Sequence, residues 1–364
     1  MLNDIYVLRS SIALNYQSLS ENEGVMDFFK TNIRESVRLK TTHNFYDLLT
    51  LFDGKKSLRE IIKESVYTRE NIEKLVSFLH SKNILIKIDS IYPKDIIGQN
   101  YRLINFLEEY CFSTSEVLKK LNLLNKSFVF IVGLGAVGTY IVDILARSGV
   151  RNFILVDNDK VELSNLHRQN LYFESDVGKY KLDCVEERLK EISKDINVKK
   201  IYKIFDESFF ENFDDIFSLA INCADFPNVD TTTKILAKEC MRRNIPHIVG
   251  GGYNLHLTLI GQSILPFETA CYECFNVELE KINGNFTNIK KLIRKNRKIG
   301  SFTPLCTMSA SLSALDAIKI LCKFYTRLTN TSARIEFKTR NMDIQRIQIP
   351  RNPICKICGK KEIL

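Results

Sequence analysis

The chain has 364 residues, 45% of them hydrophobic, and a formal net charge of +9 at pH 7, so it can build a sizeable core in two or three domains. No uninterrupted apolar run approaches the ~18 residues that span a bilayer, and the start, MLNDIYVLRSSIALNY, lacks the basic and apolar regions of a signal peptide. These features predict a cytoplasmic protein without a membrane partner.

The excess positive charge is concentrated in short runs at Lys290–Lys291, Arg294–Lys298 and Lys360–Lys361. Nucleic-acid-binding segments usually carry aromatic residues or a recognisable module beside such charge, and these runs have neither. We therefore expect no nucleic-acid partner. The charges are compatible with an acidic peptide or a nucleotide as partner, or with a solvated loop that binds no partner.

Residues 1–95 show the pattern of a small helix-and-strand module. The periodicity predicts helices at Thr42–Leu51, Ser57–Ser65 and Thr68–Ser81, followed by a strand at Lys82–Lys87. With strands before the helices, this arrangement resembles the winged-helix-like leader-peptide recognition element of enzymes that modify ribosomal peptides. It indicates a peptide-recognition module; a dimerisation or structural appendage is the alternative.

Residues 96–126 are predicted to be a linker with one helix, Arg102–Tyr110, ahead of an α/β domain at 127–364. That domain begins with a strand, Phe128–Val132, and the turn Gly133-Leu-Gly135-Ala-Val-Gly138. Glycines at this spacing let the backbone approach a phosphate at a helix N-terminus.

A helical pattern follows to about Ser148, and a second strand, Phe153–Val156, ends at Asp157. An acid at this position can bind ribose hydroxyl groups, so the βαβ unit predicts a Rossmann-like nucleotide site.

Polar and charged side chains gather in the segment after Asp157, which has few apolar residues and is predicted to be a loop: Asn165, Arg168, Gln169 and Lys181. Amide, guanidinium and ammonium groups beside a phosphate-binding turn suit a triphosphate. A solvated connecting loop is the alternative. A later strand, Leu219–Cys223, leads to Asp225, which is predicted either to hold a metal ion at the ligand crevice or to cap the next helix.

In order, these residues resemble the motifs of the ubiquitin-activating-like adenylating enzymes, which include the ThiF- and MoeB-type activators of sulfur carriers. The matching stretches are the glycine turn, Asp157–Gln169 (DNDKVELSNLHRQ), Asp176–Lys181 (DVGKYK) and Cys223–Asp225. Together with the N-terminal module, they are most similar to the microcin C peptide-nucleotidyltransferase branch.

The resemblance implies that ATP and Mg²⁺ bind and that a carboxylate attacks the α-phosphate. It implies three catalytic residues, Arg168, Lys181 and Asp225, with Asp225 holding Mg²⁺. The ATP-binding residues that it implies are Gly133, Gly135, Gly138, Asp157, Asp159, Asn165, Arg168, Gln169 and Lys181. It further implies a homodimer in which an arginine reaches the partner's phosphates, and Arg102 stands nearest to that position.

Two Cys-x-x-Cys pairs, Cys271/Cys274 and Cys355/Cys358, supply four thiolates with the spacing of a structural zinc knuckle. The family resemblance places zinc at the same positions, and a redox motif is the alternative. The other cysteines are expected to be core residues: Cys111, Cys184, Cys223, Cys240, Cys306 and Cys322.

Cys306 also precedes a predicted helix, Met308–Leu321, where a helix N-terminus can lower the pKa of a thiol; a nucleophilic role is therefore weighed against simple packing. The basic segment Ile282–Lys298 is predicted to guide a peptide C-terminus toward the α-phosphate.

The sequence thus predicts an ATP-dependent nucleotidyltransferase that activates the end of a short ribosomal peptide in microcin C-like biosynthesis. Three alternatives stay open: an enzyme that dehydrates or cyclises glutamates in a peptide, a sulfur-carrier activator, and a non-catalytic leader-peptide scaffold. The peptide, the nucleotide base and the final product are not specified by the sequence.

Overall fold

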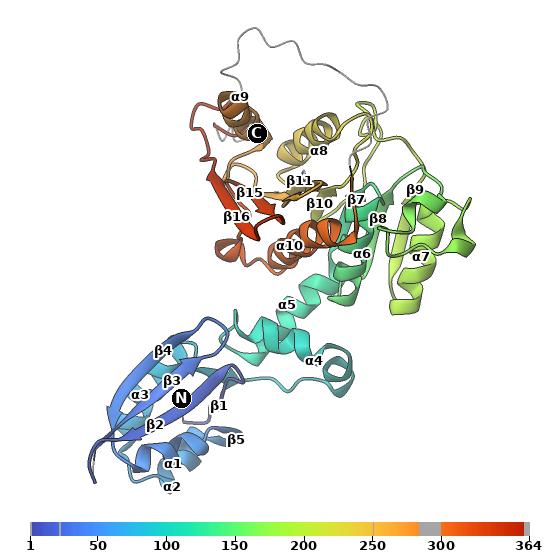
Figure 1. Cartoon of the computed structure of the whole chain (residues 1–364). Coiled ribbons are helices and arrows are strands. Elements are labelled where there is room, and N and C mark those ends of the chain that lie inside the picture. The colour runs from blue at the N-terminus through green and yellow to red at the C-terminus, as the bar shows by residue number, and fades with distance from the viewer. Residues whose placement is uncertain (1, 22, 250, 284–299, 360–364) are drawn as a thin grey trace. The chain divides into compact units, whose positions relative to one another are not determined.

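A computed structural model describes residues 2–21, 23–249, 251–283 and 300–359. The chain divides into two compact units, Met1–Asn122 and Leu123–Leu364, and each is described by itself (Figure 1). The division falls inside the 96–126 segment that the sequence analysis assigned to a linker and helix.

Two small antiparallel sheets form the strand framework of the first unit. In one sheet β1 (Ile5–Leu8) lies between β5 (Asp53–Ser57) and β6 (Leu85–Ile88). The other is a meander of β2 (Ile12–Ser18), β3 (Gly24–Lys30) and β4 (Glu35–Thr41). Because side chains alternate across a strand, β3 directs Met26 and Phe28 into the core, where both are fully buried.

Three helices pack with these sheets: α1 (Asn44–Thr50), α2 (Leu58–Glu64) and α3 (Arg69–Ser81). The three predicted helices and the closing strand are confirmed, but the unpredicted strand β5 lies between α1 and α2. The N-cap of α3 is the predicted one, because Thr68 Oγ1 accepts a hydrogen bond from Asn71 N at 3.3 Å. Its core-facing side chains are Ile72, Val76 and Leu79.

The segment after β6 forms two helices, α4 (Lys94–Glu108) and α5 (Thr114–Lys126). The predicted helix Arg102–Tyr110 was wrong in its start, because α4 already begins after Pro93. The end of α4 is fixed by Arg9, whose guanidinium donates to the carbonyl oxygens of Glu108 and Cys111. A cation at a helix C-terminus satisfies carbonyl groups that the helix itself cannot.

The second unit is built on a six-stranded sheet in the order β14-β11-β10-β7-β8-β9. Its strands are β7 (Phe128–Val132), β8 (Asn152–Val156), β9 (Asn197–Ile201), β10 (Leu219–Asn222), β11 (His247–Val249) and β14 (Gln262–Ile264). All pair in parallel except β14. The chain order reverses between β7 and β10, the point at which open α/β sheets bind ligands.

Helices α6 (Ala136–Arg147), α7 (Lys181–Ile192) and α8 (Val229–Arg243) connect these strands, but the crossover from β9 to β10 contains no regular helix. It covers the sheet with phenylalanines instead. Phe205, Phe209, Phe213 and Phe217 are buried against Phe130 of β7, whose ring stacks on that of Phe217 at a centroid distance of 5.0 Å. Aromatic burial thus replaces a helix on this face.

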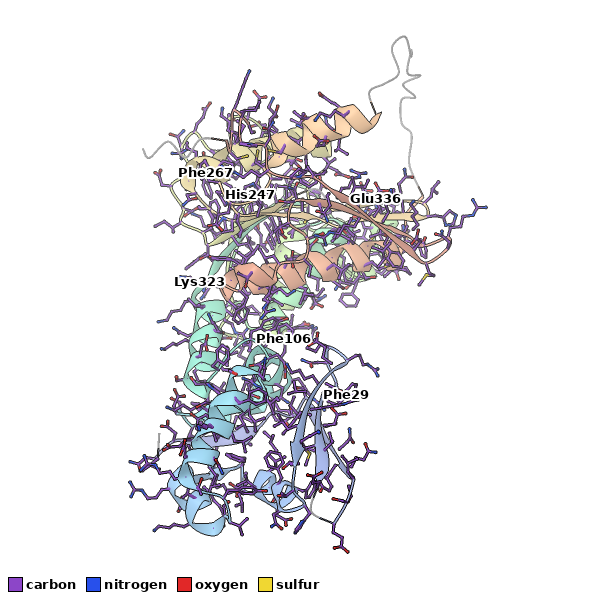
Figure 2. All side chains as sticks on the ribbon, turned by 90° about the vertical axis from the view of Figure 1, so that its left-hand side faces the viewer. Phe29, Phe106, His247, Phe267, Lys323 and Glu336 are labelled. Atoms are coloured by element: carbon purple, nitrogen blue, oxygen red, sulfur yellow. The ribbon has the colours of Figure 1, made fainter. Side chains whose placement is uncertain are left out.

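A four-stranded antiparallel sheet completes the unit: β12 (Gly252–Asn254), β13 (Leu257–Leu259), β15 (Ala333–Lys338) and β16 (Asp343–Gln348). Two more helices, α9 (Tyr272–Asn283) and α10 (Thr303–Leu321), lie in the chain between β13 and β15 of this sheet. Among the described residues α10 alone is long and apolar enough to cross a membrane, yet 67% of that stretch is buried inside the protein, as in a core helix. His247 of β11 is also enclosed within this unit (Figure 2).

Candidate active site

The glycine turn follows β7 and leads into α6. Gly133 has φ +88°, and a Cβ there would lie 2.6 Å from the backbone nitrogen of Ala224 at the end of β10. A Cβ on Gly138 would lie 2.0 Å from the Gly133 carbonyl oxygen. At Gly135, the N-cap of α6, no described atom lies within 4 Å of the Cβ position. The turn therefore packs closely against β10 and its own backbone at Gly133 and Gly138, but it leaves open space at Gly135. That open space at the helix N-terminus can accommodate a phosphate group.

Asp157 ends β8 and is linked directly to the turn. Its carboxylate accepts hydrogen bonds from Leu134 N at 2.6 Å and from Asp159 N at 2.8 Å. Burial raises the pKa of Asp157, while the charge of Lys181 and the two backbone donors oppose the rise. The acid is held beside the glycine turn, as a ribose-binding residue must be.

Lys181 begins α7, and its side chain is only 7% exposed. Its ammonium group lies 2.8 Å from Oδ2 of Asp159, which is 64% exposed, and its backbone N donates to the Asp159 carbonyl at 3.0 Å. The preceding turn contains Gly178 at φ +91° and the buried Asp176, which accepts from the side chains of Lys179 and Arg188. The lysine is thus an oriented, nearly buried cation held against Asp159, and its charge also acts on Asp157.

The loop between β8 and α7 contains the short 3-10 helices Leu163–Asn165 and Glu174–Asp176, and its predicted loop character is confirmed. Tyr172 ties it to the glycine turn, because its hydroxyl donates to the Leu134 carbonyl at 2.9 Å.

Three predicted ligand residues lie on this loop. Asn165 accepts from Glu162 N at 3.0 Å, and Arg168 Nη1 donates to the Ser164 carbonyl at 2.7 Å. Gln169 is buried, and its Oε1 has no hydrogen-bond partner among the described residues. A buried amide oxygen without a partner is costly, and this marks Gln169 as a candidate ligand contact.

Asp225 lies just beyond β10, in a segment that Asn222 holds through a hydrogen bond from Ala224 N to its side-chain oxygen at 3.1 Å. The interpretation of Asp225 as a helix cap was wrong: Asn228 caps α8 by accepting from Thr231 N at 2.9 Å. The Asp225 carboxylate is exposed and makes no hydrogen bond or ion pair within the part of the chain that the structure describes. It is free to take a cation.

Four cysteine sulfur atoms lie close together, two from the start of α9 and two from near the C-terminus. The Sγ atoms of Cys271, Cys274, Cys355 and Cys358 all lie within 4.8 Å of one another. Adjacent pairs are 3.9 Å (Cys271–Cys274), 3.7 Å (Cys271–Cys355) and 3.5 Å (Cys274–Cys358) apart. Tetrahedral thiolates at ~2.3 Å from zinc stand ~3.8 Å from one another, so the donor set fits a zinc ion.

The other cysteines are core residues as expected, all buried except the half-buried Cys223. The suggestion that the N-terminus of α10 lowers the pKa of Cys306 was wrong. Its thiol is fully buried, and burial raises the pKa despite opposing hydrogen bonds from Ser301 and Tyr253. The structure therefore favours packing.

Two further predictions stay untested. Arg102 is exposed on α4 of the first unit, and its action across a dimer remains a prediction. Most of the predicted guide segment Ile282–Lys298 lies outside the described residues.

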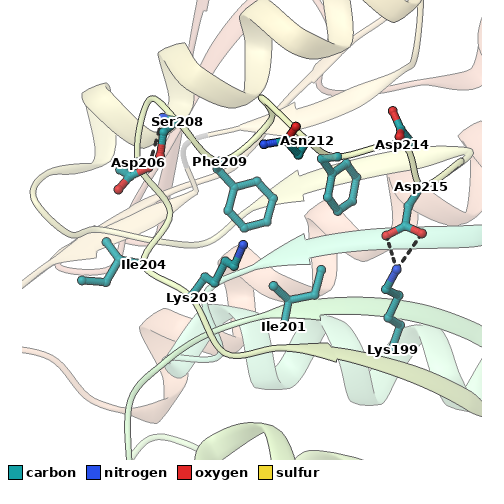
Figure 3. Close-up of a pocket in the computed structure, with 11 residues that line it drawn as sticks. Lys199, Ile201, Lys203, Ile204, Asp206, Ser208, Phe209, Asn212, Asp214 and Asp215 are labelled. Carbon is teal, nitrogen blue, oxygen red and sulfur yellow. Dashed lines mark hydrogen bonds and ion pairs between the residues drawn. The ribbon is translucent and has the colours of Figure 1, made fainter.

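A separate cavity of about 680 Å³ lies between β9 and the crossover segment (Figure 3). It is lined by Ile201, Phe209 and Phe213 and bordered by the Lys199–Asp215 ion pair. None of the predicted site residues lines it.

Three residues that the sequence analysis did not single out contact the site loop or glycine turn: Tyr172, Tyr253 and Thr303. Thr303 had a partial signal, since Thr-Pro is a frequent start of a helix. The tyrosines carried no local signal, because their partners are distant in the chain.

The glycine turn, the strand-end acids and the buried lysine at the reversal of strand order define a nucleotide-binding α/β enzyme. The ThiF family model matches residues 112–357, and the chain belongs to the ThiF family. Curated relatives include the molybdopterin-synthase adenylyltransferase of Escherichia coli (28% identity, covering 65% of this chain and 89% of the relative). The ThiS sulfur-carrier adenylyltransferase of Bacillus subtilis is 29% identical, over 66% of this chain and 67% of the relative.

Among solved structures, E. coli MccB with MccA-N7isoASN superposes with a TM-score of 0.75 at 23% identity, covering 98% of this chain and 100% of MccB. Because this likeness extends over nearly the whole chain, the fold of both units is shared with MccB. Together, these comparisons make the chain an ATP-dependent adenylyltransferase.

Proposed function

We propose that the chain transfers the adenylyl group of ATP to the C-terminal carboxyl or carboxamide end of a short ribosomal peptide, in the biosynthesis of a microcin C-like peptide–nucleotide. The main support is the arrangement of three parts. Asp157 is hydrogen-bonded to the glycine turn and to Asp159, and Asp159 pairs with the buried Lys181. This arrangement supplies a phosphate cradle, a ribose acceptor and a fixed cation in one place.

In this mechanism a peptide carboxylate oxygen attacks the α-phosphorus, and the bond from that phosphorus to the bridging oxygen of the β-phosphate breaks. Pyrophosphate leaves with the electron pair, and an acyl adenylate remains. The nucleophile is already deprotonated, so no general base is needed. Lys181 and Arg168 neutralise the charge that develops on the phosphates. Gln169 and Asn165 offer amide groups to the same nucleotide.

Asp225 is the residue that would hold Mg²⁺, because its exposed carboxylate stands at the end of β10 beside the glycine turn. The ion would supply further charge neutralisation at the phosphates. The cysteine cluster would hold zinc with all four positions taken by sulfur, which makes the metal structural rather than catalytic.

Peptide activation is favoured by the extent of the fold match. The superposition on MccB, solved with MccA, includes the N-terminal unit, whereas the E. coli molybdopterin-synthase enzyme aligns with only 65% of this chain. Sulfur-carrier activation is the second candidate, since the curated relatives include two ThiS sulfur-carrier adenylyltransferases.

The test is isotope exchange between ATP and labelled pyrophosphate. The wild type and Asp225→Ala would be assayed with a synthetic peptide encoded by the short reading frame nearest the gene, and with a sulfur carrier protein. We expect peptide-dependent exchange in the wild type and loss in Asp225→Ala. Exchange with the carrier alone would select the second candidate, and equal exchange by both variants would reject the site.

A further inference from the structure

The first turn of α10 contacts the loop that carries Arg168. Thr303 Oγ1 donates to the His167 carbonyl oxygen at 2.7 Å, joining two segments 136 residues apart in the chain. His167 immediately precedes Arg168, so this bond fixes the backbone from which the guanidinium extends.

The Thr303 hydroxyl also lies near α6, the helix that starts at the glycine turn, because it is close to the Tyr140 side chain. One hydroxyl therefore lies where three elements meet: the helix behind the phosphate cradle, α10, and the Arg168 loop.

Thr303 does not cap its own helix, which is the usual role of a threonine at a helix start. The N-cap position belongs to Phe302, which has no side-chain cap, and Pro304 follows Thr303. Its hydroxyl serves the neighbouring loop rather than its own helix.

The same stretch contacts Arg168 itself. The Arg168 guanidinium and the Ser301 hydroxyl both lie near the Tyr253 hydroxyl of β12, where they oppose the rise that burial causes in its pKa. The buried Cys306 lies next to this group, with its sulfur 3.7 Å from Ser301 Oγ. Ser301 just before α10, Thr303 and Cys306 in its first turn, and Tyr253 on β12 thus lie around Arg168 and the backbone that precedes it.

We propose that Thr303 is a positioning residue. By donating to the His167 carbonyl, it holds the Arg168 guanidinium where it can neutralise the negative charge that develops on the departing pyrophosphate. This inference rests on the proposed function, because it gives Arg168 its role at the phosphates.

The chain offers matched variants for the test. Thr303→Val removes the hydroxyl at almost unchanged shape, and Thr303→Ser restores it. Thr307→Val is the control, because Thr307 lies one turn later and its hydroxyl bonds only to the Thr303 and Pro304 carbonyls of its own helix.

In pyrophosphate exchange we expect Thr303→Val to lower kcat about tenfold, the equivalent of ~1.4 kcal/mol, with KM for ATP within about twofold. Thr303→Ser and Thr307→Val should stay near wild type. In an Arg168→Ala background, Thr303→Val should cause no further loss, since the two residues act as one unit. Wild-type kcat in Thr303→Val, or the same tenfold loss without Arg168, would overturn the proposal.

A second readout does not need activity. Amide hydrogen exchange across residues 163–170 should be faster in Thr303→Val than in Thr307→Val. If the wild type exchanges no pyrophosphate with any peptide, the proposed function fails, whereas unchanged amide protection in Thr303→Val rejects the positioning role itself.

Discussion

The ammonium group of Lys181 lies 2.8 Å from the Asp159 carboxylate, with the lysine side chain 7% exposed and the aspartate 64% exposed. The pair is asymmetric: the cation is fixed by the fold, and the anion faces solvent. An incoming phosphate can therefore replace Asp159 as the partner of the lysine without moving it. Such preorganisation is what makes a fixed charge effective in a reaction.

Replacing the lysine tests this arrangement. We expect Lys181→Met to lower kcat for pyrophosphate exchange by about 100-fold, the usual effect of losing one fixed donor at a developing charge. Methionine fills the space of the aliphatic chain, so the fold should persist. Steady-state kinetics and circular dichroism would be measured together, with Lys190→Met, at an exposed position on the same helix, as control. A folded Lys181→Met with full activity would contradict the assignment.

Zinc removal tests the cysteine cluster. We expect about one zinc per chain by mass spectrometry of the native protein. Cys355→Ser should lose the metal and about 3 kcal/mol of stability, a fall in Tm of roughly 10 °C, because metal binding is coupled to folding.

The matched control is Cys184→Ala, a fully buried cysteine on α7 outside the cluster. It should keep the metal. A stable, metal-free wild type would exclude the zinc site.

Much of the site could be predicted because its signals are local. The glycine turn, Asp157 and Lys181 occur within 49 consecutive positions of the sequence, from Gly133 to Lys181, and both strands follow from their apolar runs. The two cysteine pairs were equally visible, since each pair is set by a short turn.

What the sequence could not show depends on distant partners. Asp89 accepts from Ser115 N at 2.8 Å and so caps α5 from 26 residues away, which is why that helix was not predicted. The start of α4 was misplaced because its N-cap, Pro93, makes no side-chain cap hydrogen bond, and the end of the helix depends on the distant Arg9. The Thr303–His167 bond joins segments farther apart still.

Acid should weaken the second unit through His247. This histidine on β11 is fully buried, and burial lowers its pKa from 6.5 to about 4. In the unfolded chain this histidine is protonated below about pH 6.5, whereas in the folded chain it stays neutral down to about pH 4. The contribution to stability is therefore complete above pH 6.5 and is lost as the pH falls.

The expected loss between pH 7 and pH 4 is about 3 kcal/mol. Urea unfolding of wild type and His247→Leu across this range would measure it, and the difference between the two slopes isolates the histidine from the carboxylates. His256→Leu, at an exposed position, should show the wild-type slope. Parallel slopes for wild type and His247→Leu would show that burial of the ring is not coupled to protonation.

The last prediction separates peptide affinity from chemistry. If the first unit binds the peptide, energy gathered far from the reacting carboxylate offsets the entropy of positioning it. A cut after residue 90 would leave α4 in place without Arg9. A chain starting at Phe112 removes α4 as well and keeps the Glu116 acceptor for Phe112 N at the start of α5, so it is the better truncation. Provided that circular dichroism shows it folded, its peptide affinity should fall at least about tenfold, or ~1.4 kcal/mol, while ATP affinity changes little. Calorimetric titration measures both affinities. Normal peptide binding by the truncated chain would show that the first unit has only a structural or dimerisation role.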